Sequence, residues 1–152
     1  MGSWALSELA GAELGDARLN DRLVRVAERL AERPEASIPQ ACGSAAETKA
    51  AYRFWDNEAV TPEGILEPHR RRTVERAMQH SLALVVQDTT EIDLSSHPAA
   101  EELGYLSRPY ARGLLVHSLL CVSTDGVPLG LLDQFVWQRP PDEYGKRRTR
   151  HA

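Results

Sequence analysis

Residues 16–33, which read DARLNDRLVRVAERLAER, decide the first half of the fold. Four apolar residues in this stretch recur at steps of four, three and four: Leu19, Leu23, Val26 and Leu30. This spacing places them along one side of an α-helix. Asp16 stands where an N-cap carboxylate accepts hydrogen bonds from free backbone amides, and the proline at position 34 bars the helix from continuing. The stretch therefore predicts an amphipathic helix that ends before residue 34.

The arginines of the same stretch follow the same spacing and share one face of the predicted helix: Arg18, Arg22, Arg25, Arg29 and Arg33. Such a face can neutralise the phosphates of DNA. It can equally be a solvated face, since three acids lie at helical pairing distance from it: Asp21, Glu28 and Glu32. The net charge of −4 argues mildly against nucleic-acid binding, so both interpretations stand at this point.

Two more helices are predicted downstream. Ser44 and Glu47 have the spacing of a capping box, which opens a helix through AETKAAYRFWDN. This helix carries Lys49 and Arg53 among three aromatic residues, a mixture suited to a protein core or to sugar and phosphate. The triplet TPE at 61–63 then starts a helix that should reach about residue 80, with a kink or a restart near Pro68.

The periodicity changes at Leu82. The apolar run from Leu82 to Gln87 predicts a buried strand that delivers Asp88 at its carboxyl end, where sites often lie in α/β sheets. Residues 113–122 and 129–137 predict two further strands, joined by a tight turn that contains Asp-Gly. The fold class is therefore α+β, with a helical domain at residues 1–80 and a strand-rich domain at 81–152. The proline-containing basic stretch after residue 138 is expected to be exposed or disordered.

The chemistry that the sequence supports is narrow. It contains no Walker loop and no GxSxG, HExxH or GxGxxG motif, so nucleotide hydrolysis, acyl transfer and nicotinamide chemistry have no motif behind them. Cys42 and Cys121 lie far apart and are expected to be buried free thiols. The acids of Asp88-Thr-Thr-Glu91-Ile-Asp93 are compatible with Mg²⁺ coordination, although Asp88 can equally cap a turn. No signal peptide or membrane segment is indicated, and a cytoplasmic protein is expected.

Eight short landmarks occur in an order that resembles DDE-type bacterial insertion-sequence transposases, the family typified by the transposase of transposon five. They span nearly the whole chain: Glu13-Leu-Gly-Asp-Ala-Arg18, Arg22-Leu23, Ala51-Tyr-Arg-Phe54, Asp88-Thr-Thr90, Glu101-Glu-Leu-Gly104, Val116-His-Ser118, Gly130-Leu-Leu132 and Trp137-Gln-Arg-Pro140.

The resemblance implies an amino-terminal helical domain that grips double-stranded DNA at transposon terminal repeats, followed by the first strands of an incomplete RNase H-like core. The DNA-binding residues expected from the resemblance and the basic helix faces together are Arg18, Arg22, Arg25, Arg29, Lys49 and Arg53. Asp88 matches the first acid of the DDE triad, a ligand of the Mg²⁺ ions that the complete family enzyme uses. The matching second Asp and Glu are absent from the sequence, so the chain alone is expected to be inactive.

Two alternatives remain open. The chain can be a stand-alone regulator or inhibitor of transposition, which occupies transposon ends or pairs with full-length transposase. It can also be a helical interaction module without a nucleic-acid role. A homodimer or a complex with full-length transposase would provide its protein partner, and the resemblance places it at the bacterial nucleoid.

Overall fold

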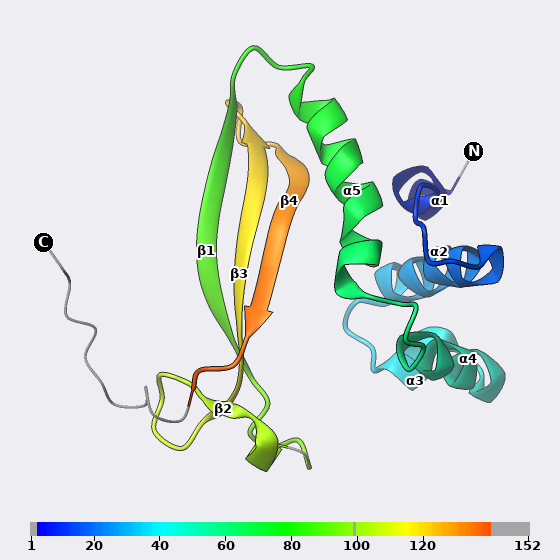
Figure 1. Ribbon diagram of the computed structural model, residues 1–152, viewed down its shortest axis with the longest axis vertical. Helices are drawn as coiled ribbons and strands as arrows, with labels where there is room; N and C mark the ends of the chain where they lie inside the picture. Colours follow the sequence, from blue (N-terminus) through cyan, green and yellow to red (C-terminus); the bar gives the residue numbers. More distant parts are fainter. Residues whose placement is uncertain (1–2, 99, 141–152) are drawn as a thin grey trace, which may run out of the picture. The chain divides into compact units, whose positions relative to one another are not determined.

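The computed structural model describes residues 3–98 and 100–140. The chain divides into two compact units, one up to Gln79 and one from His80 onward (Figure 1). Within the described residues, the first unit holds only helices and the second holds an antiparallel sheet with one short 3-10 turn. The prediction of an α+β chain in which helices precede strands is confirmed.

The helical unit consists of α1 (Trp4–Leu9), α2 (Ala17–Glu32), α3 (Ile38–Cys42), α4 (Ala45–Trp55) and α5 (Pro62–Ala77). The helix predicted from the opening stretch is α2, and the Asp16 carboxylate caps it by accepting from the Arg18 amide at 2.8 Å. The Ser44 hydroxyl caps α4 by accepting from the Glu47 amide at 3.2 Å. Both predicted starts are therefore confirmed, whereas the sequence patterns do not predict α1 and α3.

The apolar side of α2 builds the core of this unit. Leu23 is buried in one cluster, with Leu19 packed at its margin, and Val26 is buried in a second cluster, with Leu30 packed at its margin. Phe54 of α4 lies in the cluster that contains Leu23 and is only 2% exposed. Burial of one such aromatic side chain stabilises a fold by about 1.5–3 kcal/mol, so the α2–α4 contact is a main source of stability.

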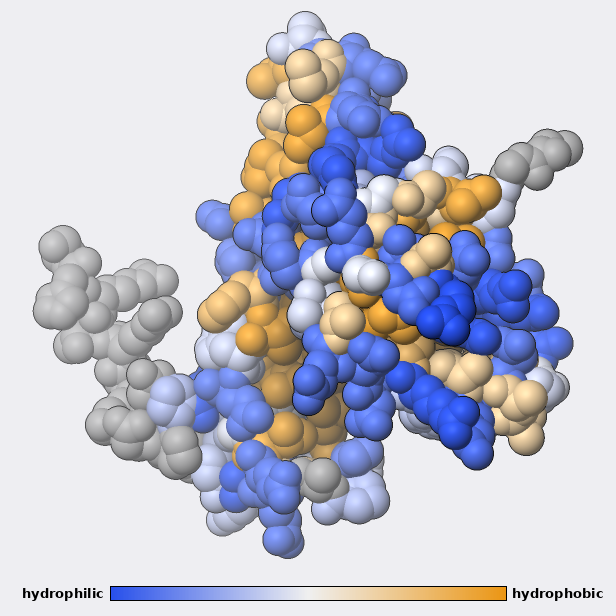
Figure 2. Space-filling model, turned by 45° about the vertical axis from the view of Figure 1, so that its right-hand side comes forward, coloured by the Kyte–Doolittle hydropathy of each residue, from blue (hydrophilic) through white to orange (hydrophobic). Residues whose placement is uncertain are grey.

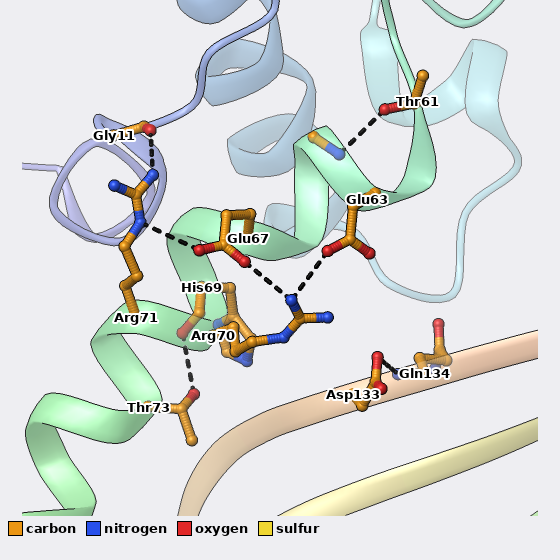
Figure 3. A network of polar contacts seen from close by, with 11 residues as sticks. Gly11, Thr61, Glu63, Glu67, His69, Arg70, Arg71, Thr73, Asp133 and Gln134 are labelled. Carbon is orange, nitrogen blue, oxygen red and sulfur yellow. Dashed lines mark hydrogen bonds and ion pairs between the residues drawn. The ribbon is translucent and has the colours of Figure 1, made fainter.

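Helix α5 runs through Pro68 without interruption and ends at Ala77. Of the two predicted alternatives at Pro68, a kink or a restart, the restart is wrong, and the helix ends before the predicted position near residue 80. Arginines that follow Pro68 form hydrogen bonds and ion pairs with other residues of the helical unit (Figure 3). Arg70 pairs with Glu63 and Glu67 at 2.8 Å, and the Arg71 guanidinium donates to the backbone carbonyl of Gly11 at 2.8 Å. Pairing thus fixes α5 and neutralises part of its charge.

Glu8 fastens α1 to α5. Its carboxylate accepts two hydrogen bonds from Arg76, at 2.8 and 2.9 Å, and lies 2.6 Å from Nδ1 of His69. The hydrogen bonds from Arg76 hold the pKa of the Glu8 carboxyl below its ordinary value, with a smaller contribution from His69. The charged form of Glu8 is therefore the one that stabilises this contact.

The second unit is built on four strands: β1 (Ala83–Asp93), β2 (Gly104–Tyr105), β3 (Arg112–Ser123) and β4 (Pro128–Trp137). β3 lies in the middle and pairs antiparallel with each of the others (Figure 1). The turn between β3 and β4 contains Gly126 at φ +82°, a conformation that glycine adopts without strain. The predicted hairpin is confirmed, with strand ends within one residue of those expected.

β1 differs from its prediction. The apolar run predicts an end at Gln87, but the strand pairs with β3 along its whole length as far as Asp93. Asp88 therefore lies in the middle of an antiparallel edge strand, and its expected position at a strand end is wrong. The residues that follow Gln87 are mostly polar, so the sequence pattern does not predict that the strand continues. Hydrogen bonds to β3 nevertheless keep these residues extended, because strand pairing can override the local preference of the side chains.

Apolar side chains of the sheet reach the surface (Figure 2). Six large apolar side chains of β1 and β4 are exposed: Leu84, Val85, Val86, Ile92, Phe135 and Val136. Both odd- and even-numbered residues of these strands are among them, so the exposed side chains lie on both faces of the sheet. The prediction that the run from Leu82 to Gln87 forms a buried strand is therefore wrong, because its large apolar side chains are exposed within the described residues.

Cys42 and Cys121 are buried free cysteines, as predicted. The carboxyl-terminal stretch that the sequence predicts to be exposed or disordered falls mostly at residues 141–152, outside the described residues.

Candidate nucleic-acid interface

The predicted DNA-binding arginines begin at the first turn of α2. Arg18 is bound to the capping residue Asp16, with Nη2 2.8 Å from Oδ2, yet its side chain is 90% exposed. The hydrogen bond from this guanidinium holds the pKa of the Asp16 carboxyl below its ordinary value. The Arg18 guanidinium is thus exposed to solvent while it remains bound to Asp16. A phosphate that binds Arg18 must compete with the Asp16 carboxylate for this guanidinium.

Arg22, one turn further on, joins the two helices. Its Nη1 donates to Oε2 of Glu47 on α4 at 2.7 Å, and its side chain is only 27% exposed. The contact orients α4 on α2 and neutralises much of the Arg22 charge. Glu47, the acid of the predicted capping box, makes this interhelical contact, and among the described residues its side chain forms no hydrogen bond with the Ser44 amide, so only the Ser44 half of the capping box is confirmed.

The two remaining predicted arginines of α2 differ from each other. The Arg25 side chain is exposed and makes no hydrogen bond or ion pair with the described residues. Arg29 pairs with Glu32 at 3.3 Å, which is one of the acid partners expected for a solvated face. Beyond them, Arg33 donates to the backbone carbonyl of Gln40 at 3.2 Å. The carboxyl-terminal part of the arginine stripe is therefore partly neutralised.

Helix α4 supplies Lys49 and Arg53, which lie one turn apart on the same side of the helix. Both side chains are exposed, and neither forms an ion pair or side-chain hydrogen bond within residues 3–98 and 100–140. Cations without an acidic partner are the ones that gain most from a phosphate, because no existing ion pair has to be broken.

Four of the six predicted residues line one open groove between α2 and α4: Arg18, Arg22, Lys49 and Arg53. Asp16 and Asn57 also line this groove, which we call the α2–α4 groove. Arg25 and Arg29 lie further along α2 and are not part of its lining. The sequence did not single out Asn57, since it lies two residues beyond α4 and carries no periodic signal.

The sequence leaves two alternatives for the aromatic residues of α4, a protein core or contact with sugar and phosphate, and the structure divides the residues between core and surface. Phe54 is buried, but Tyr52 is 50% and Trp55 37% exposed. Tyr52, Trp55 and Asp56 border a second depression, which shares Lys49 and Arg53 with the α2–α4 groove. The sequence could have shown this, because residue 54 lies on the opposite side of the helix from residue 52 at 100° per residue.

The proposed metal ligand Asp88 belongs to the second unit. Side chains alternate along a strand, so Asp88 points to one face of the sheet and both Glu91 and Asp93 point to the other. Glu91 accepts from the amide and hydroxyl of Ser107, and Asp93 from the amide and hydroxyl of Ser95.

The three acids of β1 therefore do not form a common ligand set. Among the residues that the structure describes, no group of three His, Cys, Asp or Glu side chains is placed to hold a metal ion. A single carboxylate at Asp88 does not fit the pair of divalent ions that the resemblance implies.

Comparison with known families adds one finding. Residues 1–60 match the family model described as transposase DNA-binding. All six basic residues singled out from the sequence lie inside this range, as does the whole of the α2–α4 groove. The match supports a transposase amino-terminal domain whose partner is DNA. In the described part of the chain, no helix has the length and apolar character needed to span a membrane.

Proposed function

We propose that the chain binds the ends of a transposable element as the DNA-binding part of a DDE-type, cut-and-paste transposase, and that the α2–α4 groove holds the DNA backbone. The observation that carries this proposal is the convergence of Arg18, Arg22, Lys49 and Arg53 on one groove inside the matched range. Such a domain would act where the DNA is, at the bacterial nucleoid.

The charges around the groove support backbone binding despite the overall charge of −4. Its lining holds four cations against the single acid Asp16, with Glu47 as the partner of Arg22 beside it. Because screening confines electrostatic attraction to about 10 Å at ordinary salt, this local excess matters more than the total charge. Phosphate contacts of this kind set position and affinity, and base contacts set sequence preference.

Selection from a pool of random duplexes tests the proposal and itself identifies the target sequence. The recovered sequence is then compared with a scrambled duplex by fluorescence anisotropy, at about 50 and 200 mM salt. Preference for the recovered sequence, with affinity that falls as salt rises, is the expected result. Equal and weak binding of both duplexes would instead favour an interaction module without a nucleic-acid role.

For the second unit, we propose that the strands belong to an RNase H-like core in which Asp88 is the first acid of the triad. Two divalent ions need more carboxylates than Asp88 alone can supply. The chain by itself is therefore expected neither to nick nor to join DNA when Mg²⁺ is present. Cleavage of a supercoiled plasmid by the purified wild type but not by Asp88→Asn would contradict this.

A regulatory role is the second candidate, and the exposed sheet favours it. Apolar side chains such as Val85, Val86 and Phe135 are exposed. Among the described residues β1 pairs only with β3, which leaves its other edge open to a strand of another chain. Pairing with a second copy or with full-length transposase would cover this surface. Co-expression would then reduce transposition by the intact enzyme, and an unchanged transposition frequency would remove this candidate.

A further inference from the structure

The outer side of α4 carries two aromatic residues that the core does not use. Tyr52 is 50% and Trp55 37% exposed, whereas Phe54 beside them is 2% exposed. Tyr52 and Trp55 lie three residues apart and therefore share one side of the helix. Two adjacent exposed aromatic side chains form an apolar patch, and such a patch can bind a ligand.

The two rings form an edge-to-face pair. Their centroids are 6.0 Å apart and their planes meet at 72°. In this arrangement the edge of one ring meets one face of the other, so the pair itself leaves the remaining ring faces uncovered. The exposed fractions of both side chains show that the surrounding residues leave part of that area open. A flat apolar group can therefore stack on this pair, which we call the α4 aromatic platform.

Charges identify the kind of group that fits. Lys49 and Arg53 border the platform and make no ion pair or side-chain hydrogen bond with any described residue. Asp56 borders it as well, near the carboxyl end of α4. A protein partner packed here would bury two uncompensated cations at a high cost in desolvation. A nucleotide brings its own negative phosphate together with an aromatic base.

We propose that the α4 aromatic platform binds an unpaired base at the end of DNA, while Lys49 and Arg53 hold the adjoining phosphates. The inference rests on the proposed function, because it extends the DNA path from the α2–α4 groove onto the neighbouring surface that shares both cations. Bases of a duplex are stacked on each other and cannot use the platform, so frayed or overhanging ends are its ligands.

Three DNA probes separate stacking from phosphate binding. They share one duplex of about 20 base pairs and carry a blunt end, a 3′ overhang of about three thymidines, or the same overhang made abasic. The abasic overhang keeps every phosphate and removes the bases. For the wild type, the thymidine overhang should strengthen binding by roughly 5- to 150-fold over the abasic one, the range for one stacked base.

Matched variants identify the platform as the cause. Tyr52→Ala and Trp55→Ala should remove the preference for the thymidine overhang and leave affinity for the blunt duplex unchanged. Trp55→Phe should keep part of the preference, since a smaller ring still stacks. Trp4→Ala is the control, because Trp4 is 56% exposed but lies on α1, and it should behave like the wild type.

The outcomes are distinct. If the blunt duplex binds and the thymidine overhang adds nothing beyond its abasic form, the platform is overturned and the proposed function stands. An overhang preference that survives in both alanine variants overturns the platform as well. Absence of binding to all three probes would reject the proposed function itself, and the platform with it. Circular dichroism of each variant shows that the helices remain folded.

Discussion

Replacing Lys49 and Arg53 together with alanine should flatten the salt dependence of DNA binding. Both cations line the α2–α4 groove and neither has a partner among the described residues. With Arg25, they make three unpaired cations among the six basic residues predicted to bind DNA, since Arg18, Arg22 and Arg29 pair with acids. These three should account for most of the counterions that DNA binding releases.

The magnitude follows from counterion release. Three neutralised phosphates give a slope of about −2.7 for log affinity against log salt, or roughly a 40-fold loss between about 50 and 200 mM. With one unpaired cation left, the slope falls to about −0.9 and the loss to roughly 3- to 4-fold. Anisotropy titrations of a labelled duplex at four or more salt concentrations, roughly spanning this range, measure both slopes.

Arg29→Ala provides the matched control. Arg29 is already paired with Glu32 and does not line the α2–α4 groove, so its removal should leave the slope within error of the wild type. The reasoning is refuted if Arg29→Ala lowers the slope as much as the double variant does, or if the double variant keeps the wild-type slope. Either result would show that the groove is not where DNA binds.

Three further predictions concern stability. Glu8→Gln should lower the free energy of unfolding at neutral pH by about 1.5–3 kcal/mol, the value of hydrogen bonds to a charged group, because Arg76 loses its carboxylate partner. The folded-state pKa of Glu8 is depressed; its contribution is therefore full above the ordinary value of 4.5 and is lost as pH falls through the folded pKa. Urea unfolding at neutral and acidic pH should show the wild type losing this advantage over the variant, and a constant difference would contradict it. Gly113→Ala should disturb the β1–β3 pairing, since its Cβ would overlap the carbonyl oxygen of Ile92; we expect a loss of about 1–3 kcal/mol, and unchanged amide exchange in both strands would speak against it. Phe54→Ala should destabilise the helical unit by about 3–5 kcal/mol through the cavity that it leaves, measured by thermal unfolding, and a loss below about 1 kcal/mol would show that the α2–α4 core is not a main support.

Local patterns were enough to predict where the long helices begin. The apolar residues Leu19, Leu23, Val26 and Leu30 and the cap at Asp16 define α2, because a helix repeats every 3.6 residues and its ends need side-chain partners. The β3–β4 hairpin was equally readable from its Asp-Gly turn. Helices α1 and α3 were not predicted, because they have only six and five residues and such short helices do not show a hydrophobic period.

The candidate site was predicted as a set of residues but not as a surface. The sequence pointed to basic residues on two helices, and it could not show that Arg18 and Arg22 share a groove with Lys49 and Arg53. It also could not show that Arg22 is tied to Glu47. These relations join residues about 25 to 35 positions apart, and only the packing of α4 on α2 brings them together.

Asp88 shows the same limit in the second unit. The sequence grouped it with Glu91 and Asp93, but strand pairing with β3 continues to Asp93 and the alternation of side chains then separates the acids onto two faces. The sequence by itself determined the helix periods, the caps, the hairpin turn and the residues able to carry positive charge, because these depend on neighbours within a few positions. Tertiary structure alone decided which cations are paired, which cations share a groove and which acids point to opposite faces, since these depend on hydrogen bonds and packing between distant segments.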